Sequence, residues 1–191
     1  MTNTLRWIAF AALALAQLYV PYAMIGMHER VLSEGEQVKI RCQPIDPADL
    51  FRGRYVWLSL DLGDARMGEG VSLPTAVRRM PVALKIDEDG FAKWGEVLEQ
   101  APDDRPYALA NVMPYWSSEG ETVYVETPVD RYYMNENAAP EAERLYNEQV
   151  RETPQNCYAA VRLLDGVMLI EELYLDGIPM REFVQQNASA E

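Results

Sequence analysis

The most strongly apolar stretch of the chain lies near its amino terminus. Residues 7–27 (WIAFAALALAQLYVPYAMIGM) contain no charged side chain. Because a helix rises about 1.5 Å per residue, this stretch would extend about 31 Å, which matches the hydrocarbon core of a bilayer. The pattern predicts one membrane-spanning helix at residues 7–27, in an anchor region of residues 1–30, with the lipid bilayer as its partner.

Such a segment is either a retained anchor or a cleaved signal peptide. A cleavage site needs small residues at the third and first positions before the cut. Pro21-Tyr22-Ala23 and Met24-Ile25-Gly26 are both poor sites, and Trp7 and Tyr19 resemble interfacial anchors. The sequence therefore favours a retained anchor.

Beyond residue 30, most patterned segments alternate between apolar and polar side chains. Residues 37–43 place Val38, Ile40 and Cys42 on one face, as a half-buried strand does. Further strands are predicted at residues 81–87, 91–94, 109–113 and 122–125. Residues 31–184 are therefore predicted to form a β-rich domain, all-β or α+β, built on antiparallel sheets.

The clearest hairpin is predicted late in the chain. Residues 157–164 and 167–173 are separated only by Asp165-Gly166, a pair that adopts the positive φ angles of a tight turn. Residues 140–150 begin with proline and early acidic residues, which predicts one helix in this domain. Residues 185–191 are predicted to be a disordered tail.

One strand candidate, residues 54–60 (RYVWLSL), is apolar on both faces. Val56, Leu58 and Leu60 share one face, while Tyr55 and Trp57 occupy the other. A strand covered on both sides has this composition, so the segment is predicted to be central in its sheet.

The chain also contains an internal echo. Residues 38–46 are matched by residues 122–130, and each copy is followed by a strand, an acidic residue with glycine, and another strand. The echo predicts two related halves in a barrel or sandwich, although short strands also resemble each other by chance.

The charge balance narrows the possible partners. The chain has 17 basic and 30 acidic side chains, a net charge of -13, so a nucleic acid partner is not expected. The single histidine, His28, excludes mechanisms with two imidazoles, and its place beside the apolar run argues against a Ser-His-Asp site. No cofactor or metal site is predicted, because Asp87, Glu88 and Asp89 lack the alternating ligands of a calcium loop.

The orientation in the membrane is not decided by charge counting. Arg6 lies on one side of the span, and Arg30, Lys39 and Arg41 follow on the other. Long domains are translocated largely regardless of charge, so we expect the C-terminal domain to be extracytoplasmic. Without Arg6 its net charge is -14, which anionic lipid surfaces repel.

The two cysteines, Cys42 and Cys157, are too far apart in sequence for a Cys-x-x-Cys redox pair. In an exported domain they are expected to form one structural disulfide. The alternative is two separate buried thiols that pack as small apolar side chains.

Two groups of side chains are candidates for binding or chemistry. Aromatic residues could form a platform for a glycan or a peptide, although most such residues lie in cores and cross-strand pairs; they are Trp57, Trp94, Trp116, Tyr115, Tyr132 and Tyr133. Lys85 and Arg162 each lie in a strand with apolar neighbours and could be catalytic or anion-binding, or they could be ordinary surface side chains. The alternative function is a carboxylate- or lysine-dependent envelope hydrolase, in which two acidic residues from different strands meet in a cleft.

Residues 44–60 (PIDPADLFRGRYVWLSL), together with the N-terminal span and the late hairpin, resemble the GDYXXLXY family of bacterial membrane-anchored proteins. Gly53, Tyr55 and Leu58 fit the motif that names the family. Arg54 stands where that motif has Asp, and Leu60 stands where it has its final Tyr. The resemblance implies a bacterial membrane location and a domain of unknown activity.

The motif segment supplies the candidate site residues. Asp46, Pro47 and Asp49 have turn chemistry, and Gly53 permits a positive φ angle before the strand. The complete set of motif or structural candidates is Asp46, Pro47, Asp49, Arg52, Gly53, Tyr55, Trp57 and Leu58. No catalytic residue is predicted. We expect an accessory or interaction protein rather than an enzyme, although an envelope hydrolase stays open. We expect it to be held at the outer face of a bacterial cytoplasmic membrane and to bind another membrane or envelope protein.

Overall fold

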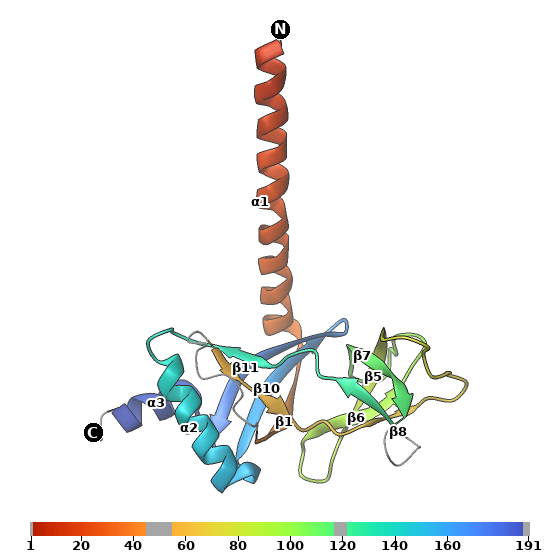
Figure 1. The fold of residues 1–191 in the computed structure, drawn as a ribbon, viewed down its shortest axis with the longest axis vertical. Helices are drawn as coiled ribbons and strands as arrows, with labels where there is room; N and C mark the ends of the chain where they lie inside the picture. The colour runs from red at the N-terminus through yellow and green to blue at the C-terminus, as the bar shows by residue number, and fades with distance from the viewer. Residues whose placement is uncertain (1, 45–54, 117–121, 189–191) are drawn as a thin grey trace.

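The computed structural model describes residues 2–44, 55–116 and 122–188. Helix α1 (Thr2–Glu34) stands away from the rest of the chain, with the N-terminus at its far end (Figure 1). The helix is long and apolar enough to span a membrane, and its apolar window is 0% buried. The predicted N-terminal apolar helix is confirmed.

The main sheet joins strands from both ends of the domain. It is antiparallel, in the order β12-β11-β10-β1-β3. Its strands are β1 (Glu36–Gln43), β3 (Ser59–Leu60), β10 (Cys157–Leu164), β11 (Val167–Leu175) and β12 (Ile178–Pro179). Val38, Ile40 and Cys42 of β1 are buried, as their alternation predicts. Between β10 and β11, Asp165 and Gly166 have φ angles of 50° and 77°, which confirms the predicted hairpin turn.

The middle of the chain forms a closed barrel in the order β4-β6-β5-β7-β8. Its strands are β4 (Ala65–Met67), β5 (Arg78–Ile86), β6 (Ala92–Val97), β7 (Tyr107–Trp116) and β8 (Thr122–Glu126). The pair β4 and β6 is parallel, and the other pairs are antiparallel. Trp94, Val82 and Val112 are among the buried side chains of the barrel strands. The predicted β-rich, antiparallel fold class is therefore confirmed.

Helices α2 (Ala139–Glu152) and α3 (Met180–Ala188) lie to one side of the main sheet, and the barrel lies to the other (Figure 1). A short 3-10 turn, η1 (Pro154–Asn156), connects α2 to β10. On α2, Ala142, Tyr146 and Val150 are spaced by four residues and are all buried. The tail predicted to be disordered from residue 185 begins as a helix instead, because Val184 packs into the core and α3 continues through Ala188.

The internal echo does not correspond to two related halves, because one unit is an open sheet and the other is a closed barrel. Residues 38–43 of its first copy lie in β1 of the main sheet, and residues 122–126 of its second copy lie in β8 of the barrel. The barrel is inserted between β1 and β10, which pair directly, with Val38 opposite Val161. The two strands of the internal echo therefore have different neighbours. Along the sequence, the barrel strands lie between two strands of the main sheet.

A short joint connects α1 to the main sheet. Val31 in the last turns of α1 is only 2% exposed, and the Gly35 N–H donates to the Val31 carbonyl at 2.9 Å. Arg162 of β10 donates from Nη1 to the Gly35 carbonyl at 3.0 Å. A Cβ at Gly35 would lie 2.4 Å from the Val31 oxygen, so only glycine fits between α1 and β1.

Main-chain hydrogen bonds join the sheet to the barrel. The Asp61 N–H donates to the Arg41 carbonyl at 2.8 Å, and the Trp94 N–H donates to the Leu62 carbonyl at 2.8 Å. At the tip of the late hairpin, the Gly166 carbonyl accepts from the Leu109 N–H of β7, also at 2.8 Å. The hairpin turn thus contacts the barrel directly.

Candidate functional site

The described part of the family motif forms β2 (Tyr55–Trp57), which pairs with β9 (Arg131–Tyr133) in a separate two-stranded sheet. Val56 is 0% exposed and Leu58 is 2% exposed, whereas Trp57 on the opposite face is 39% exposed. The prediction of a central strand is therefore wrong. The segment is divided between β2 and the edge strand β3, and one of its apolar faces lies at the surface.

Aromatic side chains gather on the outer face of this small sheet. Tyr55 lies opposite Tyr133, with ring centroids 5.8 Å apart in an edge-on arrangement. Arg131 lies opposite Trp57, and its guanidinium carbon is 5.3 Å from the centre of the Tyr55 ring. Tyr133 is 64% exposed. We refer to Tyr55, Trp57, Arg131 and Tyr133 as the aromatic face.

The middle residue of β9 points the other way and holds the strand in place. Tyr132 is 2% exposed, and its hydroxyl donates to the Glu172 carboxylate of β11. Arg181 of α3 donates from Nε to the Tyr132 oxygen at 3.3 Å. Burial and the Glu172 carboxylate raise the pKa of Tyr132. The phenol therefore stays protonated as a hydrogen-bond donor and orders β9, on which half of the aromatic face is built.

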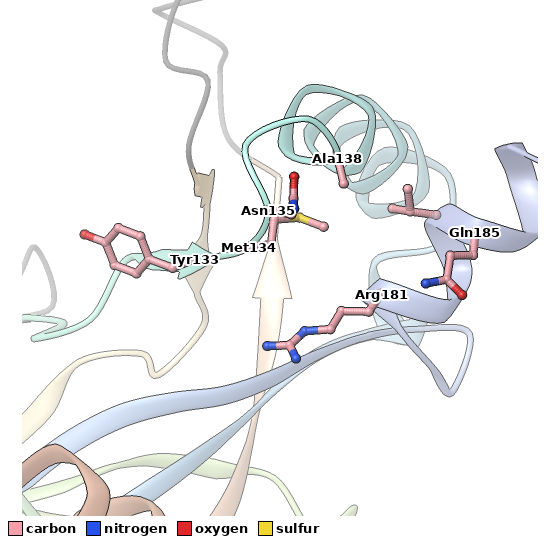
Figure 2. A pocket seen from close by; sticks show the side chains of 7 residues that line it. Tyr133, Met134, Asn135, Ala138, Arg181 and Gln185 are labelled. Atoms are coloured by element: carbon pink, nitrogen blue, oxygen red, sulfur yellow. The ribbon is translucent and has the colours of Figure 1, made fainter. Parts of the chain in front are cut away.

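A cleft of about 500 Å³ lies next to the aromatic face. Its lining residues are Tyr133, Met134, Asn135, Ala138, Arg181, Val184 and Gln185. Figure 2 shows Arg181 and Gln185 on α3 across from Met134 and Asn135, while the Tyr133 ring points away from α3. The cleft combines apolar side chains with one guanidinium, so it can take an apolar side chain that ends in, or lies beside, an acceptor group.

The structure brings together only some of the motif candidates. Tyr55 and Trp57 lie on the aromatic face, and Leu58 lies in the core with its N–H donating to the Asp130 carbonyl at 2.8 Å. The other candidates lie outside the described residues: Asp46, Pro47, Asp49, Arg52 and Gly53. Sequence reasoning missed Arg131, because its place opposite Trp57 follows only from the pairing of β2 with β9.

Cys42 and Cys157 are both buried free thiols, so the predicted disulfide is wrong. Burial raises the pKa of each thiol to about 12. The Cys42 thiol lies beside the Tyr146 hydroxyl, whereas the Cys157 Sγ is 3.8 Å from the Thr153 carbonyl oxygen. The two thiols are not bonded to each other, and they pack as small apolar side chains.

The other residues considered for catalysis or ion binding lie at the surface or make contacts within the fold. Lys85 is exposed on β5, and Arg162 is paired with Glu171 of β11. The Asp87 carboxylate accepts hydrogen bonds from the main-chain N–H groups of Asp89 and Phe91 at 3.0 and 2.8 Å. These hydrogen bonds lower the pKa of Asp87, and the bond from Phe91 has the larger effect. Among the described residues, no group of three or more His, Cys, Asp or Glu side chains is placed to hold a metal ion.

The fold and its exposed motif strand define a class: a β-rich domain, carried on a long apolar N-terminal helix, that presents a motif strand at its surface. A family model described as GDYXXLXY protein matches residues 17–173, so the chain belongs to this family. The match includes the second half of α1, the barrel and nearly all of the main sheet. Searches of curated proteins and of solved structures gave no match to the chain.

Proposed function

We propose that this protein is a membrane-anchored accessory subunit whose aromatic face binds another membrane or envelope protein. The observation that carries the proposal is the placement of Tyr55, a position of the family motif, and of the exposed Trp57 on the outer face of β2 beside Tyr133 and Arg131. Tyrosine, tryptophan and arginine are the residues most enriched where protein interfaces bind tightly. A motif strand needed only for the core would not require an aromatic outer face.

The anchor part of the proposal is supported by the surface of α1. Its apolar side chains are exposed from Leu5 to Met27. An exposed apolar surface of this length is unfavourable in water. Residues 28–34 add about 10 Å of helix beyond the span, so the domain of residues 31–184 would stand just outside the hydrocarbon. We place this domain on the extracytoplasmic side of a bacterial cytoplasmic membrane, because long domains are exported largely regardless of charge.

The cleft beside the aromatic face fits the same role. Tyr133 belongs to both, so a bound segment that covers the aromatic rings can extend a side chain toward Arg181. Aromatic anchors at the centre of an interface provide contact area, and a pocket at the edge defines the orientation of the bound segment. A short peptide segment of a partner is the occupant that this geometry suits.

Co-purification of the full-length chain from mildly solubilised membranes tests the proposal. Replacing Trp57 and Tyr133 by alanine should reduce partner recovery about tenfold or more, without changing the melting temperature by more than a few degrees. The matched control is Tyr115→Ala, because Tyr115 is 54% exposed but lies on β7 of the barrel. A partner that remains bound to the double variant, or a chain that always purifies alone at native expression, would overturn the proposal.

A further inference from the structure

The middle of α1 contains a polar site within its apolar surface. Gln17 lies at the centre of the uncharged run of residues 7–27. Pro21 lies one turn further along the same helix. Proline has no N–H, so the carbonyl of the residue four positions earlier, which is Gln17, loses its helical hydrogen bond. A side-chain amide and a free main-chain carbonyl therefore occur together at one depth.

These groups have no partner within the described part of the chain. The window of α1 that could cross a membrane is 0% buried, so no other described element covers it. In hydrocarbon, each unsatisfied polar group is costly, and polar residues in spanning helices face other protein groups for this reason. Residues four apart lie about 40° from each other around a helix, so Gln17 and Pro21 share one face.

We propose that α1 pairs with α1 of a second copy of this chain, with the Gln17 amides hydrogen-bonded across the interface. The proposal rests on the membrane anchoring proposed above. A second copy is favoured because glutamine is self-complementary: its amide both donates and accepts. Two parallel copies place their Gln17 residues at the same depth without further adjustment. The side-chain amide of each Gln17 has two N–H groups. One can donate to the amide oxygen of the partner's Gln17, and the other can donate to the Gln17 main-chain carbonyl that lacks its helical hydrogen bond because of Pro21.

The negative charge of the domains does not prevent such a pair. From Gln17 to Glu34 the helix extends about 25 Å, so two helices that cross near Gln17 at about 40° are roughly 20 Å apart where the domains begin. The net charge of -14 beyond Arg6 opposes close approach of the two domains. At physiological salt the Debye length is about 8 Å, so this repulsion is largely screened at that separation.

Leu13 and Leu15 provide a matched pair of positions for a cross-linking test. Leu13 lies about 40° from Gln17 around the helix and Leu15 about 160°, so they are on opposite faces at similar depth. Both are exposed, at 59% and 69%. Leu13→Cys in the full-length chain, oxidised in membranes with copper phenanthroline, should give a disulfide-linked dimer, whereas Leu15→Cys should give little. The unmodified chain reports any background from its two buried thiols.

Adding Gln17→Leu to Leu13→Cys should reduce the cross-linked fraction about fivefold or more, and Gln17→Asn should largely retain it. Equal cross-linking at both positions, or no effect of Gln17→Leu, would overturn the pairing. Extraction with alkaline carbonate separates this result from a failure of the anchor. A chain that resists extraction but gives no Leu13→Cys dimer overturns only the pairing. A chain that is extracted overturns both proposals.

Discussion

Arg162 on β10 and Glu171 on β11 form an ion pair through two hydrogen bonds, from Nε to Oε2 at 2.8 Å and from Nη2 to Oε1 at 3.0 Å. The remaining nitrogen of Arg162 donates to Gly35, where α1 meets the sheet. Gln37 of β1 also donates to Glu171. The Arg162 guanidinium thus joins the end of α1 to β11, and Glu171 extends this network to β1 through Gln37.

Arg162→Met should lower the melting temperature, because it leaves Glu171 and the Gly35 carbonyl without a charged donor. The hydrogen bond from Arg162 is the main cause of the lowered pKa of Glu171. A carboxyl with a lowered pKa stabilises the fold above its unfolded pKa, near 4.5, and this contribution is lost as the pH falls. In thermal melts of the full-length protein in detergent, the difference between wild type and Arg162→Met should therefore become smaller from pH 7 to pH 3. A constant difference across this range would contradict the assignment.

Gly166→Ala should destabilise the protein more than Gly177→Ala. Both glycines follow an aspartate in a tight turn and have nearly equal φ angles of 77° and 78°. A Cβ at Gly166 would lie 2.7 Å from Leu109 and 2.8 Å from Tyr107, whereas nothing lies within 4 Å at Gly177. The left-handed backbone costs alanine about 1–2 kcal/mol at either site, and the contact with the barrel adds to this only at Gly166. Equal melting temperatures for the two variants would show that the hairpin does not depend on the barrel.

Leu58→Ala should lower the free energy of unfolding by about 2–5 kcal/mol, because it removes a side chain that is only 2% exposed and leaves a cavity. Trp57→Ala, one residue earlier on the outer face, should cost much less. Urea unfolding monitored by circular dichroism gives both values. A larger effect of Trp57→Ala than of Leu58→Ala would contradict the division of the motif between the core and the aromatic face.

The buried thiols predict a loss of stability at alkaline pH. Cys42 and Cys157 have pKa values raised from 9.0 to about 12, so the folded state keeps its protons while the unfolded state releases them. Stability should be complete below about pH 9 and should fall as the pH rises toward 12. Burial also raises the pKa of Tyr146, which adds to this loss. The measurement is a series of melting temperatures from pH 8 to pH 11.

The same thiols should be protected from reagents in the native protein. A maleimide at pH 7 should label neither cysteine in the folded chain and both in urea, because the thiolate is scarce and the side chains are buried. The reagent also tests the absence of the disulfide, since a bridged pair would stay unlabelled in urea until it was reduced. Rapid labelling under native conditions would contradict the burial of Cys42 and Cys157.

Several elements could be predicted from the sequence because their signals are local. The uncharged run predicts α1, the alternation of Val38, Ile40 and Cys42 predicts the buried face of β1, and Asp165-Gly166 predicts the late hairpin. Each depends on a periodicity or a turn geometry that a few neighbouring residues determine. Part of the candidate site was also predictable, since Tyr55 and Trp57 share a face by period-two alternation alone.

The pairing of the strands and the surroundings of the side chains were decided only by the tertiary structure. Alternation defines the two faces of a strand but not its partner, so nothing in residues 55–57 indicates that β9 is their neighbour and that one apolar face is left at the surface. The same limit applies to Cys42 and Cys157, whose even number indicates a bridge although both are free, buried thiols. The sequence by itself determined the long apolar N-terminal helix, the β-rich class and the hairpin. The tertiary structure decided which strands meet, because many strands with equivalent patterns compete and only the packing of the whole core selects among them.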